Sequence, residues 1–408
     1  MRSKLKNFDF TLMITPLLLA IFGIIMIYSA SMVSAVVEGL ESTYYLKRQL
    51  QWFVLGLIGF LFCSTFSYKY YQKFIKLIIL VSVILLIGVL FFGDTAHNAT
   101  RKIAIKSISI QPAEFVKIGL ILYLASAYSK KQAYINDFFK GVLPPLVLTA
   151  TVVSLIVMQP DIGTSAIIFA TACAMVASSG IHLKHIFVLF SISIVFLAVT
   201  IPSMITPVRI ARVVGAYKPF TDPGDVGHHL IESYLAIGVG GLTGEGLGQS
   251  IQKLGYLWGA HTDFIMSIIA EELGFIGVVI VIGLLAIIVL RGFYIARKCD
   301  DHFGSLVAIG ISTMIGVQAF INLGAISGVL PITGVPLPFV SYGGSSLMAL
   351  MISVGILNNI AMSVKRQEPN PKKVDKQEVH DEENIFRRRH LQRQKWSNQT
   401  IPFKFRGK

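Results

Sequence analysis

One carboxylate stands where a long polar segment meets an apolar run. Asp263 follows His261 and Thr262 and precedes the apolar run that begins at Phe264. The polar segment before it, about 206–262, is rich in glycine and charged residues. Ionisable groups at membrane depth mark functional sites by default. The junction therefore predicts a reaction site or a transport site at Asp263.

Six further charged residues lie in or beside apolar runs: Arg101, Glu114, Lys117, Asp161, Glu271 and Glu272. Because burying a charge in lipid is costly, these side chains should face a shared polar cavity or pair with one another. Glu114 and Lys117 are three residues apart on one helical face, so a mutual salt bridge is the alternative to a substrate role. Asp161 follows Pro160 in a very short turn, and capping of the next helix is its alternative role.

Asp263 has a structural alternative as well. Either Asp263 or Thr262 is placed to cap the helix that begins with the apolar run. Asp263, Ser267 and Glu271 are spaced four residues apart, share one helical face and extend over roughly 12 Å. Such a polar stripe predicts a lined cavity. Glu272 points away from the stripe, and we expect it to bond another helix.

The composition is that of an integral membrane protein. Hydrophobic residues make up 54% of the chain and charged residues 14%, against roughly 25% charged in a soluble domain. Apolar runs near the ~20 residues that cross a bilayer recur along the chain. We predict an all-α protein with ten transmembrane helices, at about 10–31, 50–66, 74–93, 111–128, 142–158, 162–179, 186–205, 264–290, 304–325 and 343–363.

Basic residues predict the orientation. With a cytoplasmic N-terminus, 26 of the 36 Lys and Arg residues fall on the inner side, as the positive-inside rule requires. Both termini are then cytoplasmic, and the large loop of about 206–262 is extracellular. The chain divides into a membrane domain, 1–363, and a basic tail, 364–408, which we expect to be solvated and disordered, with contact to anionic lipid as the alternative. The net charge of +14 needs no nucleic-acid partner.

Local structure can also be predicted for two irregular segments, one in the large loop and one at 330–346. Within the large loop, 229–240 predicts a short interfacial amphipathic helix, with Leu230, Ile231, Tyr234 and Leu235 on its apolar face. The glycines that follow indicate either tight backbone turns or a flexible connector.

The second irregular segment, 330–346, contains three prolines and ends in a run of glycine and serine. Prolines break helices, and broken backbone is tolerated at membrane depth only against protein or water. We expect the segment to fold back into the outer face. Its N–H groups then form either an anion-binding nest or a plain re-entrant turn. The sequence contains no P-loop, dinucleotide fingerprint or Cys/His metal motif, so any chemistry does not use ATP directly.

Four blocks of sequence carry a family resemblance: Gln111–Lys117 (QPAEFVK), Gln159–Thr164 (QPDIGT), His261–Phe264 (HTDF) with Glu271–Gly274 (EELG), and Asn322 with Gly334–Ser346 (GVPLPFVSYGGSS). Over about residues 10–363 the chain resembles the SEDS family (shape, elongation, division and sporulation), which includes FtsW, RodA and SpoVE. The overall pattern and the basic tail favour a division-type, FtsW-like member.

The resemblance implies a peptidoglycan glycosyltransferase of the bacterial cytoplasmic membrane, acting on its outer face at the division septum. Its substrates are lipid II and a growing glycan on undecaprenyl pyrophosphate, and its product is a β-1,4-linked strand. It also implies a class B penicillin-binding protein with transpeptidase activity as partner, together with other division proteins. A flippase or transporter for the same lipid and a non-catalytic division scaffold are the competing functions.

Roles for the residues follow as hypotheses. An inverting transfer needs one general base, and Asp263 is the candidate. Burial near Glu271 raises the pKa of a carboxyl, whereas a helix N-terminus lowers it, and the sequence does not decide between the two effects. We expect Arg101 and Lys117 to stabilise the departing pyrophosphate, with Arg209 and Arg212 as second choices.

The remaining site residues divide into two groups. Gln111, Glu114, Ser341 and Ser345 are expected to contact substrate, whereas His261, Thr262, Glu271 and Asp161 are expected to shape the cavity. A divalent cation, Mg²⁺ or Mn²⁺, held by Asp263 together with substrate phosphates is a further expectation. No nucleotide is expected.

Overall fold

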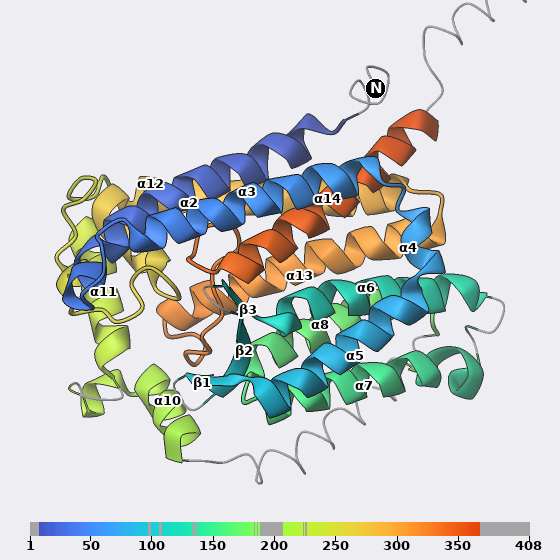
Figure 1. Ribbon diagram of the computed structural model, residues 1–408, viewed down its shortest axis with the longest axis horizontal. Coiled ribbons are helices and arrows are strands. Elements are labelled where there is room, and N and C mark those ends of the chain that lie inside the picture. Colours follow the sequence, from blue (N-terminus) through green and yellow to red (C-terminus); the bar gives the residue numbers. More distant parts are fainter. Residues whose placement is uncertain are drawn as a thin grey trace, which may run out of the picture. The chain divides into compact units, whose positions relative to one another are not determined.

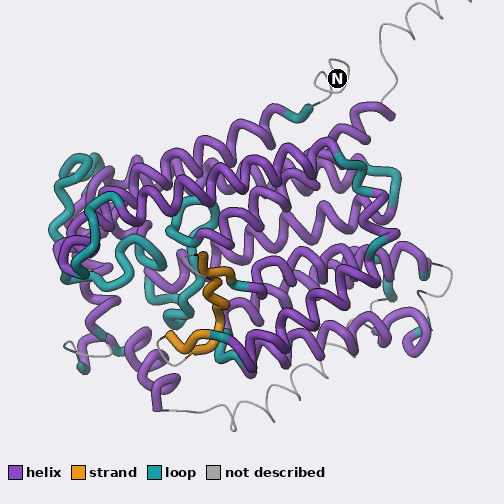
Figure 2. The backbone as a smooth tube through the Cα atoms, viewed as in Figure 1, coloured by secondary structure: helices purple, strands orange, loops and turns teal. Residues whose placement is uncertain are grey.

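The computed structural model describes residues 8–96, 99–105, 108–132, 135, 137–182, 184–185, 187, 207–222, 224 and 227–367 (Figures 1 and 2). Contacts divide the chain into one unit of residues 1–362 and a second of 363–408. The architecture below is that of the first unit. Beyond the end of α14, the basic tail predicted for 364–408 lies outside the described residues.

Helices form most of the described chain (Figure 2). The longer ones are α2 (Phe10–Val37), α3 (Tyr44–Thr65), α5 (Ile75–Phe92), α6 (Pro112–Lys130), α7 (Leu143–Met158), α8 (Ile162–Ser178), α12 (Ile265–Lys298), α13 (His302–Ile326) and α14 (Gly344–Gln367). The shorter ones are α4 (Lys69–Lys73), α10 (Pro207–Tyr217), α11 (His228–Gly240) and the single turns η2 (Phe138–Val142), η3 (Pro219–Thr221) and η4 (Gln252–Leu254).

The helices agree with the predicted membrane architecture. Nine of the ten predicted spans coincide with helices, and the tenth, 186–205, lies almost wholly outside the described residues. Six of the described helices, α2, the continuous η2–α7 helix, α5, α12, α13 and α14, are long and apolar enough to cross a membrane. The protein is therefore a helical, multi-pass membrane protein, and the number of ten spans stays a prediction.

A small β-sheet between α5 and α6 was not predicted. Strands β1 (Asp94–Ala96), β2 (Ala99–Ile105) and β3 (Ile108–Ile110) form a three-stranded antiparallel sheet in the order β1-β2-β3 (Figure 2). Ile103 pairs with Ile110 and Ile105 with Ile108, which fits the preference of β-branched residues for strands. The strands are too short for the alternation of their side chains to stand out between two long apolar helices.

Polar contacts fasten one end of the helix bundle. Asp9 caps α2 by accepting hydrogen bonds from the N–H groups of Thr11 and Leu12. The same carboxylate accepts a 2.9 Å hydrogen bond from Nε of Arg291 near the end of α12, and its own N–H donates to Asn358 of α14. The start of α2 and the ends of α12 and α14 therefore lie at the same end of the bundle. We call the other end, where the connections described below gather, the loop end.

The connection between α13 and α14 folds back into the bundle at the loop end, as predicted. Within α13, Gln318 donates to the carbonyl of Pro336 (3.0 Å) and Asn322 to the carbonyl of Val335 (2.8 Å). Gln318 lies eight residues before the end of α13, so the connection returns by about 12 Å along that helix.

Of the two alternatives for this connection, the plain re-entrant turn rather than the anion nest is present at residues 341–343. Their N–H groups donate to Leu337 O, His261 O and Gln49 Oε1, respectively. Because these donors already have protein acceptors, they are not available to an anion.

The large loop contains two helices. The predicted amphipathic helix is present as α11, but the buried face carries Leu230, Ser233 and Ala236, whereas Tyr234 and Leu235 are exposed. Helix α11 packs along α12, so only Leu230 of the predicted apolar face is buried against protein, and the predicted contact of this helix with the membrane interface stays a prediction. Helix α10 was not predicted. Four glycines after α11, Gly241, Gly244, Gly246 and Gly248, have positive φ, so the tight-turn interpretation is correct.

Two glycines of α11 give a matched test of this packing. A Cβ on Gly240 would collide with the carbonyl of Ala270 in α12, whereas a Cβ on Gly238 meets nothing within 4 Å. We expect Gly240→Ala to lower the melting temperature in detergent by several degrees, since overpacking costs about 1–3 kcal/mol. Gly238→Ala should raise it slightly, because alanine favours a helix by roughly 0.5–1 kcal/mol over glycine. Equal melting temperatures for the two variants would contradict the close packing of α11 on α12.

Candidate active site

Asp263 lies in the turn that leads into α12, at the loop end of the bundle. Its side chain is half-buried, and the helix is capped by Phe264 without a side-chain hydrogen bond. The alternative role, in which Asp263 or Thr262 caps α12, is therefore wrong. Thr262 instead donates its hydroxyl to the carbonyl of Gly259 within the same turn.

The main chain of Asp263 is held by α13. Nδ2 of Asn322 donates to the carbonyl of Asp263 and to that of Val335, each at 2.8 Å. Asn322 is 1% exposed. A single buried amide therefore ties the turn that carries Asp263 to the re-entrant connection.

Arg101 faces Asp263 across a small gap. Arg101 lies on β2, donates from Nη2 to the carbonyl of Pro160, and has Nη1 3.8 Å from Oδ1 of Asp161. A Cβ placed on Gly334 would lie 3.5 Å from Oδ2 of Asp263 and 3.7 Å from Nη1 of Arg101. Gly334 has a φ of +73°, a conformation that favours glycine. The absence of a side chain at this position leaves the carboxylate and the guanidinium lining the same space.

The carboxylate of Asp263 differs from the other buried carboxylates. Among the described residues it makes no hydrogen bond and no ion pair. Each of the other buried carboxylates has a partner: Asp9 bonds Arg291, Glu114 pairs with Lys117, Asp161 bonds Thr164, Glu271 bonds Ser250 and Glu272 pairs with Lys253. Burial raises the pKa of Asp263 to about 6. Arg101, Lys102 and Arg212 each oppose this rise, and the negative charge of Asp161 adds to it. Desolvation therefore dominates, and the pKa lies close to neutral pH.

Asp161 caps α8, as its alternative role predicted. Its carboxylate accepts hydrogen bonds from the N–H and the hydroxyl of Thr164 (3.1 and 2.9 Å) and from Nε2 of Gln111 (3.1 Å). The N–H of Gln111 in turn donates to the hydroxyl of Ser345 at the start of α14 (3.2 Å). Three predicted site residues thus form one network that joins α6, α8 and α14 beside Arg101.

His261 belongs to an aromatic cluster on the same turn. Its ring centroid lies 4.5 Å from that of Tyr45 on α3 and 5.6 Å from that of Tyr342. The carbonyl of His261 accepts a 2.9 Å hydrogen bond from the N–H of Tyr342. Burial lowers the pKa of His261 to about 4, so the ring is neutral at pH 7 and serves to hold the turn.

Glu114 and Lys117 form a buried ion pair, as their alternative role predicted. Nζ of Lys117 lies 3.0 Å from Oε2 of Glu114 and donates to Oε1 of Gln318, also at 3.0 Å. Both charged side chains are at most 4% exposed. The ammonium group is engaged inside the bundle, so the predicted contact between Lys117 and a pyrophosphate has no support in this arrangement.

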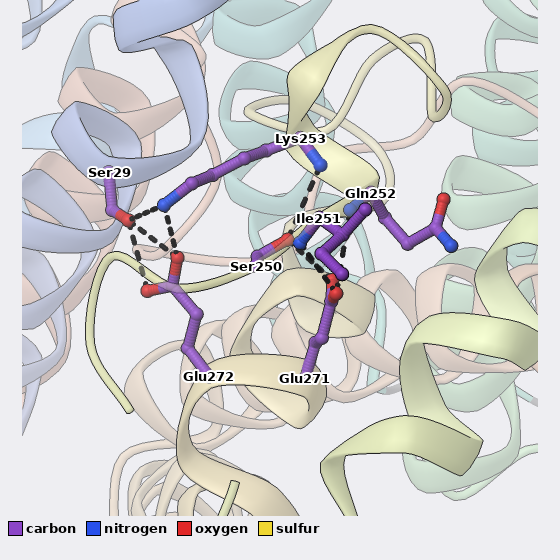
Figure 3. Close-up of polar contacts among 7 residues, drawn as sticks. All are labelled: Ser29, Ser250, Ile251, Gln252, Lys253, Glu271 and Glu272. Atoms are coloured by element: carbon purple, nitrogen blue, oxygen red, sulfur yellow. Dashed lines mark hydrogen bonds and ion pairs between the residues drawn. The ribbon is translucent and has the colours of Figure 1, made fainter. Parts of the chain in front are cut away.

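The predicted polar stripe from Asp263 to Glu271 does not line a common cavity. Ser267 shares a 2.8 Å hydrogen bond with Ser233 of α11. Glu271 accepts hydrogen bonds from the hydroxyl of Ser250 and from the N–H groups of Ile251 and Gln252 (Figure 3). The sequence spacing placed these residues on one face correctly, but the large loop covers that face and uses its polar atoms.

Three predicted residues remain. Arg212 lies exposed on α10 and lowers the pKa of Asp263. The side chain of Arg209, also on α10, lies outside the described residues. Ser341 accepts a 2.8 Å hydrogen bond from the N–H of Leu337, so it stabilises the re-entrant connection rather than facing a substrate.

The described residues contain no group of three or more His, Cys, Asp or Glu side chains that would hold a metal ion. Asp161, the nearby carboxylate that influences the pKa of Asp263, is already occupied by Thr164 and Gln111. A protein-only cage for Mg²⁺ or Mn²⁺ does not fit these residues, and we derive no step through a metal ion.

The chemistry available here is proton abstraction beside a positive charge. An unpaired carboxylate with a pKa near neutral is suited to general base catalysis. Arg101, with Lys102 and Arg212 nearby, supplies positive charge where an anion develops. The arrangement favours a displacement in which a hydroxyl loses a proton while an anionic group departs.

Comparison with known proteins identifies the family. The family described as "Cell cycle protein", whose members include FtsW, RodA and SpoVE, matches residues 10–366. The chain belongs to the FtsW/RodA/SpoVE family. The probable peptidoglycan glycosyltransferase FtsW of Bacillus subtilis (strain 168) is 49% identical over 383 residues, covering 91% of this chain and 95% of that protein. Stage V sporulation protein E of the same organism is 38% identical, covering 88% and 99%.

Solved structures of family members share the fold. A chain in a structure on the coordination of polymerization and crosslinking by a peptidoglycan synthase complex has a TM-score of 0.73 and 26% identity, covering 88% of this chain and 98% of that one. The rod shape determining protein RodA of Thermus thermophilus has a TM-score of 0.64 and 26% identity, covering 89% and 98%. The helical membrane architecture is therefore shared within the FtsW/RodA/SpoVE family.

Three residues had no role assigned from the sequence: Asn322 and Gly334 at the site, and Lys253, which contacts Glu272 in the first part of α12. Asn322 and Gly334 lie in the sequence blocks that carry the family resemblance. Asn322 bonds main-chain carbonyls, and Gly334 leaves space because it has no side chain. Neither role can be recognised from a pattern of side chains. Lys253 lies in the loop between two glycines, Gly248 and Gly255. A lone lysine in a glycine-rich extramembrane loop gives no signal of burial.

The bridging amide of Asn322 can be tested by a substitution of similar size. We expect Asn322→Leu to lower the melting temperature in detergent by several degrees, because the buried carbonyl of Val335 loses its donor at about 1–3 kcal/mol and the part-buried carbonyl of Asp263 loses the same donor. Ser327→Ala is the matched control, since within the described part of the chain that hydroxyl bonds Leu323 and Gly324 of its own helix. A melting temperature for Asn322→Leu equal to that of the control would show that the bridge does not stabilise the turn.

Proposed function

We propose that this protein is a peptidoglycan glycosyltransferase that polymerises lipid II into β-1,4-linked glycan strands during cell division. The carrying observation is the half-buried carboxylate of Asp263, without a partner among the described residues, facing Arg101 across the space at Gly334. Membership of the FtsW/RodA/SpoVE family and the 49% identity to a probable peptidoglycan glycosyltransferase support the assignment.

The proposed reaction is a single displacement with inversion. Asp263 takes the proton from the 4-hydroxyl of the acceptor GlcNAc while that oxygen attacks the anomeric carbon of the donor sugar. The bond from the anomeric carbon to the pyrophosphate oxygen breaks, and its electron pair leaves with undecaprenyl pyrophosphate. Arg101, with Lys102 and Arg212, stabilises the negative charge on the departing group.

The location follows from the substrates. Both are anchored in lipid, so the site belongs at the membrane surface. We place the loop end, with the large loop, outside the cytoplasmic membrane at the septum and both termini in the cytoplasm, because this orientation satisfies the positive-inside rule.

A class B penicillin-binding protein is the proposed partner, since a structurally similar chain belongs to a peptidoglycan synthase complex that polymerises and crosslinks. A requirement for Mg²⁺ or Mn²⁺ shared between Asp263 and substrate phosphates stays a prediction.

Removal of the base is the direct test. We expect Asp263→Asn to accumulate in membranes as the wild type does and to polymerise purified lipid II at least about a hundredfold more slowly, since general base catalysis contributes ~10²–10⁴-fold. The measurement is glycan formation in detergent with the transpeptidase partner present. Detergent has no second leaflet, so glycan formed there also separates a polymerase from a flippase. Polymerisation by Asp263→Asn at the wild-type rate would rule Asp263 out as the base.

The pH dependence of the rate tests the electrostatics. The base acts when deprotonated and its pKa is about 6, so the rate should fall as the pH drops through about 6. Arg101→Gln removes the largest effect that lowers this pKa, so the midpoint should move to higher pH. Lys102→Gln should move it less, because Lys102 contributes less than Arg101.

Lys47→Gln is the control, because Lys47 is exposed and pairs with Glu41 instead. If the pH midpoint of the rate is unchanged in Arg101→Gln, the fall in rate at low pH is caused by the titration of a group other than Asp263.

A further inference from the structure

Helix α12 is broken close to Asp263. Gly274 has φ 66° and ψ −164°, so the helix is interrupted after its first two and a half turns. The break frees carbonyls before it and N–H groups after it, and such groups must be satisfied internally at membrane depth. The first part of α12, residues 265–273, is therefore not held in place by simple continuation of the spanning helix.

The glycine-rich segment after α11 supplies hydrogen-bond partners for the main chain on both sides of the break. The N–H groups of residues 245 and 246 donate to the carbonyls of Glu271 and Glu272 (2.9 and 3.0 Å). In return, the N–H groups of residues 275 and 276 donate to the carbonyls of residues 241 and 242 (2.9 and 3.3 Å). A Cβ on Gly244 would collide with the main chain of Glu272 and Leu273, so only glycine allows this approach. The first part of α12 is thus bound to the large loop.

Three side chains then fix this assembly to α2. Nζ of Lys253 donates to Oε1 of Glu272 (2.7 Å) and to the hydroxyl of Ser29 on α2 (3.0 Å), and the same hydroxyl donates to Glu272 (2.7 Å) (Figure 3). The side chains of Lys253 and Glu272 are 3% and 0% exposed. Removing one partner of a buried ion pair leaves a charge uncompensated.

We propose that Lys253 is a positioning residue for Asp263, acting through its buried contact with Glu272 and Ser29. The inference rests on the proposed function and deepens it. No break separates Ile265 from Leu273, so a displacement at Glu272 is transmitted to Asp263, nine residues and roughly 13 Å away. Arg101 belongs to β2, outside this assembly, so the displacement changes the distance between Asp263 and the positive charge that faces it.

The effect on Asp263 has a measurable signature. The charged groups that act on Asp263 come from β2 (Arg101 and Lys102), α10 (Arg212) and the turn before α8 (Asp161). Movement of the carboxylate away from Arg101 weakens catalysis and shifts the acid limb of the rate to higher pH. A side chain that only stabilises the fold would lower the amount of protein without changing the turnover or the pH midpoint of the molecules that fold.

The experiment measures lipid II polymerisation against pH for the protein with its transpeptidase partner, normalised to folded protein. We expect Lys253→Met to lower kcat by about tenfold or more with KM unchanged, since a displacement near 1 Å can cost ~100-fold, and to raise the pH midpoint. Lys253→Arg keeps the charge and should recover part of the rate. Lys47→Met is the matched control, because that lysine lies in an exposed ion pair at the same end of the bundle.

A milder variant covers the case in which Lys253→Met does not accumulate. Ser29→Ala leaves the ion pair intact and should lower kcat by about two- to fivefold with the same direction of pH shift, a smaller displacement than that of Lys253→Met. If Lys253→Met has the kcat and the pH midpoint of the wild type, the positioning role is overturned. If Lys253→Met does not accumulate, the same result for Ser29→Ala overturns it. Asp263→Asn measured alongside separates the two proposals, because an active Asp263→Asn contradicts the proposed function itself.

Discussion

Polar groups at membrane depth must find partners within the protein, and the loop end of this bundle is built around that requirement. The main chain departs from helix at Gly274 and along the connection after α13. Each departure is satisfied by a neighbouring segment: the glycine-rich loop bonds the break in α12, and Gln318 and Asn322 bond the connection. Because an unsatisfied group in hydrocarbon costs several kcal/mol, these contacts fix where the irregular segments lie.

The same requirement makes Asp263 informative. The other buried carboxylates are matched to a lysine, an arginine, a hydroxyl or main-chain N–H groups, so their charges are compensated in the folded protein. Asp263 makes no such contact among the described residues and lies instead across a gap from Arg101. Within the part of the chain that the structure describes, a carboxylate without a partner where comparable groups have one fits the proposed role, in which the acceptor hydroxyl of the substrate is the partner. The other buried carboxylates of the described ranges each have a partner, and this contrast distinguishes Asp263 from them.

The sequence predicted what depends on local pattern. The lengths of the apolar runs predicted the long helices, and the prolines predicted the re-entrant connection. The i, i+3 spacing of Glu114 and Lys117 indicated that they could form an ion pair. It could not predict which polar groups meet across the bundle. The β-sheet that carries Arg101, the buried face of α11 and the contact between Lys253 and Glu272 all depend on the packing of segments distant in the chain, which sequence spacing does not encode. Several motif residues named from the sequence, such as Glu114, Lys117 and Asp161, therefore have structural contacts that their spacing predicted only as alternative roles.

The break in α12 has a physical rationale if Asp263 is the base, as proposed. A continuous α12 would place Asp263 wherever the spanning helix ends, and its position would follow tilts of that helix in the bilayer. The break at Gly274 separates the two, and the first part of α12 takes its position from α2, α11 and α13 through the contacts of Glu272, Ser267 and Asn322. Catalysis requires the base to keep its place relative to the groups that bind the other reacting atoms. Attachment of the Asp263 turn to α13, and of the first part of α12 to α2 and α11, supplies that constancy, whereas a single spanning helix would not.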